Sequence, residues 1–219
     1  MNRFLEVLFL GLAVLLPLPL QAEDVAQTLK RDFQARGQAT MDRLEQDALQ
    51  RVCTKFADQP PAELARLLEA DQMKTIAFPA GSLIGDWKRG EGIAQSGRGA
   101  SWSDPRGAAG GGSCYNCHQL SPQEASYGTL GPSLLGFGRL RGNGPDIQKY
   151  AYGKIYNAKA YNLCSQMPRL GHSGTLSEQQ IKDLVGLLLD SGSPVNQEVM
   201  SSGRTVFIVR RHPSHRPAP

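Results

Sequence analysis

The chain has 219 residues, with 24 lysines and arginines against 20 aspartates and glutamates, and a formal net charge of +4 at pH 7. This length suits one domain of ordinary size, or one domain with an appendage, and the chain contains no internal repeat and no phosphate-cradling glycine motif. Four arginines in the C-terminal tail supply the basic excess, and because no basic stripe is interleaved with stacking aromatics, we do not expect nucleic-acid binding.

The first 22 residues predict a secretory signal peptide. Arg3 lies in the short n-region, an apolar run covers residues 7–20, and the small residue Ala22 precedes two acidic residues, so cleavage is expected after Ala22. A membrane anchor is the alternative, but the run has only about fourteen residues, including two prolines, and is short for a bilayer. We therefore expect a periplasmic protein with no membrane span after signal cleavage.

Residues 23–80 are predicted to form a helical extension. Apolar residues recur with helical spacing from residue 25 to about residue 56, and Gly37 is expected to break this run in two. A shorter helix is expected after Pro60 and Pro61, whose fixed backbone angles suit a helix start. Its apolar edge consists of Leu64, Leu67 and Leu68. The extension either packs on the following domain or provides a docking surface for another subunit.

The domain predicted over residues 81–196 begins and ends with a capped helix. Asp86 can cap a helix from Trp87 to about Gln95. Ser177 and Gln180 form a capping box at the start of the last helix. The apolar stripe of that helix consists of Ile181, Leu184, Val185 and Leu188. Glycines that indicate a close crossing of the two helices are Gly90, Gly92 and Gly186.

Between these helices, a glycine-rich loop leads into the segment CYNCH, which contains Cys114, Cys117 and His118. A zinc site would need four ligands, and the two other cysteines of the chain stand far apart. A thioredoxin-like redox pair would end a strand in a βαβ pattern, which does not flank this segment. Cys-x-x-Cys-His is the attachment motif of c-type haem, with the histidine as an axial ligand. We therefore predict one covalently bound haem c, with a buried pair of thiols as the alternative.

The second axial ligand is expected to be Met167. The other methionines lie in the signal peptide, before the domain or after its last helix, whereas Met167 lies in a loop just before that helix. In c-type cytochromes with this order of helices and haem motif, the methionine ligand comes from a loop in this position. His172 is the alternative ligand, and Met167 would then fill a gap in the core. Arg169 is either a partner of a haem propionate or an ordinary surface residue.

Small c-type cytochromes carry a Gly-Pro pair after the haem motif, and Gly131 and Pro132 match this pair. By this similarity, we expect the backbone carbonyl of Pro132 to accept a hydrogen bond from His118. Such a bond orients the imidazole and makes it a stronger donor to a metal.

The haem motif uses two of the four cysteines, which leaves Cys53 and Cys164 in an oxidising compartment. We expect a disulfide between them that ties the helical extension to the loop of Met167. Two separate thiols, or a cysteine that faces a partner protein, are the alternatives.

Three segments resemble the SoxX family, the monohaem cytochrome c subunits of the thiosulfate-oxidising SoxAX complex: CYNCHQLSPQEASYGTLGPSLLGFG, IYNAKAYNLCSQMPRLGHSGTLSEQQIKDLVGLLLD and SPVN. The similarity covers about residues 85–196, and its most specific part is the pattern KAYN-x-C-x-x-MPR-x-G. It does not cover residues 197–219, which are predicted to be a basic, disordered tail. The resemblance implies a class I cytochrome c fold with an N-terminal helical extension.

The resemblance also implies a partner and a function. The chain would form a periplasmic heterodimer with a SoxA-like haem subunit, and together they would act as an L-cysteine S-thiosulfotransferase. The SoxA-like subunit, which holds the catalytic sulfur centre, would couple thiosulfate oxidatively to a cysteine of a SoxYZ-like carrier. This chain would accept the electrons and pass them to a soluble cytochrome c. A freestanding, diffusible electron carrier is the alternative function, and a peroxidase-like site with a labile methionine is a third.

Overall fold

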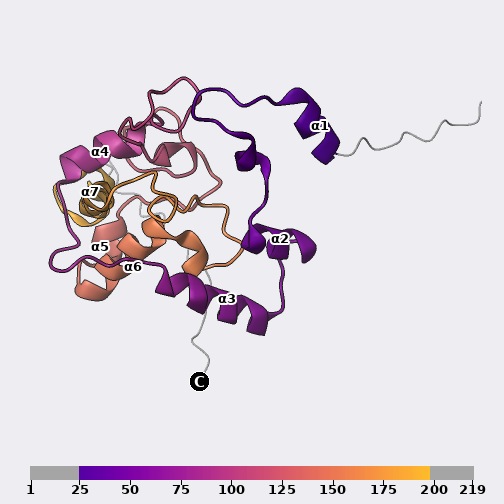
Figure 1. The fold of residues 1–219 in the computed structure, drawn as a ribbon. Coiled ribbons are helices and arrows are strands. Elements are labelled where there is room, and N and C mark those ends of the chain that lie inside the picture. The colour runs from indigo at the N-terminus through magenta and orange to yellow at the C-terminus, as the bar shows by residue number, and fades with distance from the viewer. Residues whose placement is uncertain (1–24, 198–219) are drawn as a thin grey trace, which may run out of the picture. The chain divides into compact units, whose positions relative to one another are not determined.

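The computed structural model describes residues 25–197, in which helices are joined by loops (Figure 1). The α-helices are α1 Val25–Asp32, α2 Ala48–Lys55, α3 Ala62–Lys74, α4 Trp87–Gln95, α5 Phe137–Arg141, α6 Pro145–Tyr156 and α7 Glu178–Leu189. The 3-10 helices are η1 Met41–Leu44, η2 Cys114–Asn116, η3 Ala158–Ala160 and η4 Pro194–Asn196. Within this described range, β pairing is confined to one isolated bridge between Arg36 and Ala39, so the predicted all-α class is confirmed. The predicted signal peptide, and the predicted tail beyond Gln197, lie outside the described residues.

The chain divides into two units, residues 1–34 and residues 35–219. The described part of the first unit is α1 with two further residues, and its last turn is extended by a bond from Phe33 N to Leu29 O (3.0 Å). The other helices named above belong to the second unit.

The helical run expected from residue 25 to about residue 56 is interrupted for longer than its apolar spacing predicts. Gly37 does break it, because this residue has a φ of +56° and a Cβ atom there would overlap the carbonyl oxygen of Trp102. Regular α-helix resumes only at α2, where Asp47 is the N-cap and forms a capping box with Gln50. The prediction of helix was therefore wrong for most of residues 33–47, where η1 is the one helical segment.

The extension predicted over residues 23–80 packs, from residue 35 onward, within the same unit as the rest of the chain. Helix α3 follows Pro61 as predicted, and it lies against η3. The side-chain amide of the fully buried Asn157, which precedes η3, donates to Gln72 Oε1 and to Thr75 Oγ1, both at 3.0 Å. These contacts favour the packed form of the extension, although Leu67 on its predicted apolar edge is 59% exposed.

Helices α4 and α7 cross at the predicted glycines. A Cβ atom at position 90 would overlap the backbone oxygen of Asp183, and one at Gly186 would overlap that of Gly85. Gly92, by contrast, has open space around it, so it does not contribute to the crossing. Both predicted caps are present: Asp86 accepts from Lys88 N, and Ser177 forms the capping box of α7.

Asp183 joins the two helices by charge as well as by packing. Its side chain is 3% exposed and accepts from Arg89 Nε (2.9 Å) and from the backbone N–H of Asp86 (2.9 Å). Burial alone would raise the pKa of Asp183, but the hydrogen bonds from Arg89 and Asp86 outweigh it and hold that pKa below its usual value.

The hydrophobic core lies around α7. The predicted stripe of this helix is buried, and it packs with residues of α4, α5 and α6. The buried core residues of α7 and its neighbours include Ala94, Phe137, Tyr152, Ile155, Ile181, Leu184, Val185 and Leu188. Figure 1 shows these four helices gathered together, with α2 and α3 beside the loops on their other side.

Candidate functional site

The two free cysteines and His118 lie on one tight turn. Helix η2 begins after Ser113, which has a left-handed φ of +47°, and the N–H groups of Cys117 and His118 both donate to the carbonyl of Cys114, at 3.1 and 2.9 Å. The preceding glycines let the chain pass close to other backbone. A Cβ at Gly110 would overlap the carbonyl oxygen of Thr175, and one at Gly111 that of Ser96.

His118 is oriented by the segment that contains Gly131 and Pro132. Its Nδ1 lies 2.7 Å from the carbonyl oxygen of Pro132, which confirms the contact predicted from the sequence. Because a carbonyl can only accept, Nδ1 is the donor in this contact, and Nε2 is the ring nitrogen left for another partner. Gly131 backs the ring so closely that a Cβ atom would overlap the imidazole, and its N–H donates to the carbonyl of Cys117 (2.8 Å).

The thiols of Cys114 and Cys117 are both free, and their surroundings do not suit a redox pair. Burial, with a smaller contribution from the neighbouring Cys117, raises the pKa of Cys114 to about 11. Thiols of reactive Cys-x-x-Cys pairs instead have a lowered pKa, which keeps the thiolate available at neutral pH. The thioredoxin-like alternative is therefore disfavoured by the environment of Cys114.

The turn also lacks the companions that a zinc site needs. Across residues 25–197, three metal-ligating side chains come together only at Cys53, Asp58 and Cys164, and the two sulfurs of that group are bonded to each other. A structural zinc ion needs four ligands with deprotonated sulfurs. Neither group of cysteines supplies such a set.

Met167 is half-buried and packs against the hydrophobic core, as do Cys114 and Tyr115 of the haem-motif turn. His172, the alternative ligand, is exposed, and its backbone N–H donates to the carbonyl of Tyr156 (3.0 Å). Met167 thus borders the same core as the cysteine turn, whereas His172 is exposed.

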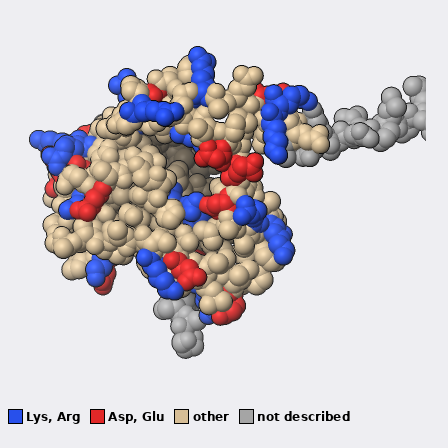
Figure 2. Space-filling model, in the orientation of Figure 1, with Lys and Arg blue, Asp and Glu red and all other residues tan. Residues whose placement is uncertain are grey.

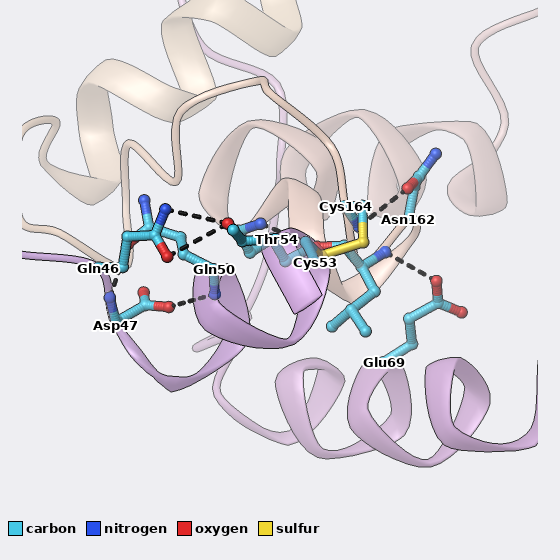
Figure 3. The surroundings of a disulfide bond; sticks show 10 residues. Gln46, Asp47, Gln50, Cys53, Thr54, Glu69, Asn162 and Cys164 are labelled. Carbon is cyan, nitrogen blue, oxygen red and sulfur yellow. Dashed lines mark hydrogen bonds between the residues drawn. A yellow bond between two sulfur atoms is a disulfide. The ribbon is translucent and has the colours of Figure 1, made fainter. Parts of the chain in front are cut away.

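The predicted disulfide between Cys53 and Cys164 is confirmed, with a Cα–Cα distance of 5.5 Å. Figure 3 shows Cys53 on α2 bonded to Cys164 on the loop that leads to Met167. Glu69 on α3, which is labelled in the same figure, accepts a hydrogen bond from the N–H of Leu163 (2.8 Å). The loop is therefore held by two helices of the N-terminal extension.

Two further contacts hold this loop, and the first of them could not be predicted from the sequence. The guanidinium of Arg169 forms an ion pair with Asp47, whose side chain also caps α2. The buried ammonium of Lys159 donates to the carbonyl of Leu163 (2.8 Å), and desolvation lowers the pKa of this lysine. The capping pattern of Asp47 is visible in the sequence, but its partner lies 122 residues away. Arg169 is thus paired with Asp47, and with 21% of its side chain exposed it is not a simple surface residue.

Positive and negative side chains are mixed over the face drawn in Figure 2, and no continuous stripe of lysine and arginine crosses it. In the described part of the chain, no helix combines the length and the apolar character that a membrane crossing demands.

No family model matches the chain. An uncharacterized lipoprotein of Aquifex aeolicus (strain VF5) is 34% identical to it over 158 residues, which cover 69% of this chain and 73% of that protein. Similarity of this extent over most of both chains indicates common descent and a shared fold. The chain therefore belongs to the same family as the uncharacterized lipoprotein of Aquifex aeolicus.

Proposed function

We propose that the protein is a c-type cytochrome with a class I fold, in which Cys114 and Cys117 hold haem through thioethers and His118 and Met167 bind its iron. The observation that carries this proposal is the hydrogen bond from His118 Nδ1 to the Pro132 carbonyl (2.7 Å), next to two free cysteines on the same turn. In metal sites, a hydrogen bond at one ring nitrogen fixes the orientation of the histidine and directs the other nitrogen, here Nε2, to the metal.

The described residues fit such a group in three further respects. The half-buried Met167 borders the core that the cysteine turn also borders, and thioether sulfur is a common axial ligand of haem iron. Gly131 leaves room for the imidazole to lie flat against the backbone. Helices α4 and α7 cross at Gly90 and Gly186, with the haem motif between them in the chain, which is the arrangement expected for a class I cytochrome c.

The haem, when bound, would supply a one-electron iron couple. The chain would hold it in place through its two cysteines, orient His118 and shield the iron from water with the apolar residues around Met167. Methionine as a ligand raises the reduction potential and closes the iron to other ligands, so electron transfer is favoured over peroxidase chemistry.

We further propose that the electrons come from a SoxA-like subunit. Formation of a sulfur–sulfur bond between thiosulfate and a carrier thiol releases two electrons and one proton, and this chain would accept the electrons one at a time. The sequence pattern around Met167 supports this assignment. A freestanding electron carrier remains the second candidate, because none of the described contacts requires a partner chain.

A periplasmic location is proposed on two grounds besides the signal-like N-terminus. Disulfides persist in oxidising compartments, and Cys53 is bonded to Cys164. The relative from Aquifex is named a lipoprotein. We do not propose a lipid anchor on a cysteine of this chain, because two of its four cysteines form the disulfide and the other two form the proposed haem site.

Three measurements test these proposals. Intact mass spectrometry of the exported protein should give the polypeptide mass plus one haem, and the polypeptide mass alone would refute the haem assignment. Replacement of Met167 by Ala should remove the near-infrared sulfur-to-iron band of the oxidised protein. Purification from periplasm should recover a second c-type haem chain, whereas a monomer that is fully active with unrelated redox partners would favour the freestanding carrier.

A further inference from the structure

The residues on both sides of Met167 are tied to the same short helix, α2. We refer to residues 163–169 as the Met167 loop. Three residues before Met167, Cys164 is bonded to Cys53 in the last turn of α2. Two residues after Met167, Arg169 forms an ion pair with Asp47 at the N-terminus of α2. Helix α2 therefore holds the loop at both of its own ends.

The two sides of the loop are held in different ways, and the backbone after Met167 is also bonded, since Ser173 N–H donates to the carbonyl of Arg169 (2.9 Å). Before Met167, the disulfide is reinforced at Leu163, whose N–H donates to Glu69 and whose carbonyl accepts from Lys159, both at 2.8 Å. After Met167, the side-chain contact that reaches α2 is the pair between Arg169 and Asp47. Loss of that pair would leave the C-terminal side of the loop attached to α2 only through the remote disulfide.

Asp47 serves both helix and loop through its two carboxylate oxygens. Oδ1 accepts from the backbone N–H of Gln50 (2.8 Å) and caps α2, whereas Oδ2 receives the Arg169 guanidinium. The side chains of Arg169 and Asp47 are 21% and 36% exposed, so water screens the pair only in part. Since the cap fixes the carboxylate on α2, the position of Oδ2 determines where Arg169 can lie.

We propose that Asp47 is a positioning residue for Met167 and acts through Arg169. Helix α2 would then determine how firmly Met167 is held as a ligand of the haem iron. This inference rests on the proposed function, because it assumes that Met167 is an iron ligand. It goes beyond that function by assigning a ligand-holding role to a residue in the N-terminal extension.

The test is Asp47→Asn in the full-length, haem-loaded protein. Asparagine is as good an N-cap as aspartate, so α2 keeps its cap while the charge on the loop contact is lost. Imidazole, which competes with methionine for ferric iron, should bind about fivefold more tightly, equivalent to about 1 kcal/mol. The near-infrared sulfur-to-iron band should weaken at a lower imidazole concentration than in the unmodified protein.

The matched control is Asp86→Asn, which makes the same change at the N-cap of α4. Asp86 also pairs with an arginine, Arg89, at 3.4 Å, and belongs to the crossing of α4 and α7. The imidazole affinity of the Asp86→Asn variant should equal that of the unmodified protein. Equal affinities for Asp47→Asn and the unmodified protein, or equal shifts in both variants, would overturn the positioning role.

Variants of Arg169 separate positioning from simple stabilisation. Arg169→Lys keeps a cation and should restore much of the methionine's resistance to imidazole, whereas Arg169→Gln should resemble Asp47→Asn. A urea midpoint that falls in Asp47→Asn while imidazole affinity stays constant would assign Asp47 a purely structural role and reject the inference. If Met167→Ala leaves the near-infrared spectrum unchanged, Met167 is not the iron ligand and the proposed function is wrong on this point. If Met167→Ala loses the sulfur-to-iron band but Asp47→Asn behaves like the unmodified protein, only the positioning role of Asp47 fails.

Discussion

Removal of the disulfide by the double substitution Cys53→Ala and Cys164→Ala should destabilise the protein by several kcal/mol. The two cysteines are 111 residues apart in the sequence, so the bond restricts a long loop in the unfolded chain. In the chain-entropy model, closing a loop of this length contributes about 5 kcal/mol at 25 °C. Native-state strain and residual structure in the unfolded chain reduce such values, so we expect a measured loss of about 3–5 kcal/mol.

The assay is urea unfolding of the haem-loaded protein, followed by far-ultraviolet circular dichroism. With a slope of about 2 kcal/mol per molar urea, the midpoint should fall by about 1.5–2.5 M. Reductant should lower the midpoint of the unmodified protein by a similar amount and leave the double variant unchanged. This control separates loss of the bond from loss of side-chain packing at Cys53, which is 5% exposed.

A loss below about 1 kcal/mol would refute the reasoning, because the loop-closure contribution would then be absent. A reductant effect that persists in the double variant would also contradict it, since Cys114 and Cys117 would then account for the sensitivity to reductant.

Two further predictions concern the crossing of α4 and α7. Gly90→Ala should destabilise the fold by about 1–3 kcal/mol or more in urea unfolding, because its methyl group would overlap the backbone of Asp183. Gly92→Ala, in the same helix but with open space, should instead stabilise it by up to about 1 kcal/mol, and equal effects would contradict the crossing. The pKa of Asp183 is lowered in the folded state, so its contribution to stability is present above the unfolded value near about 3.9 and is lost as pH falls through the folded pKa. Urea midpoints measured from about pH 5 downward should therefore fall less steeply in Asp183→Asn, and identical slopes would contradict the role of Arg89.

Contacts that depend on neighbours along the chain could be predicted from the sequence. The caps at Asp86 and Ser177 involve residues within three positions of each other, and both are present. The glycines at 90 and 186 indicated a close crossing, because glycine destabilises a helix and is commonly found in one where another backbone packs closely. The contact from Pro132 to His118 spans 14 residues and was predicted through a known motif.

The interruption of the first helical run shows where spacing fails. Residues 33–47 keep helical apolar spacing, yet the chain leaves the helix there, with Gly37 in a left-handed conformation and the backbone of Trp102 lying against it. The glycine itself predicted the break at residue 37, but the length of the interruption was not predicted, because apolar residues continue at helical spacing beyond it.

The sequence alone determined the chemistry that is available: two cysteines and a histidine on one turn, a methionine before the last helix, and an even number of remaining cysteines. Only the tertiary structure decided how that methionine is held. Asp47 and Glu69 carry no sequence signal for this task, because an ion pair over 122 residues and a hydrogen bond over 94 residues depend on where folding brings the chain together. Helical periodicity reports on a few neighbouring turns, whereas the contacts of Arg169 and Leu163 arise from the packing of α2 and α3 against the Met167 loop.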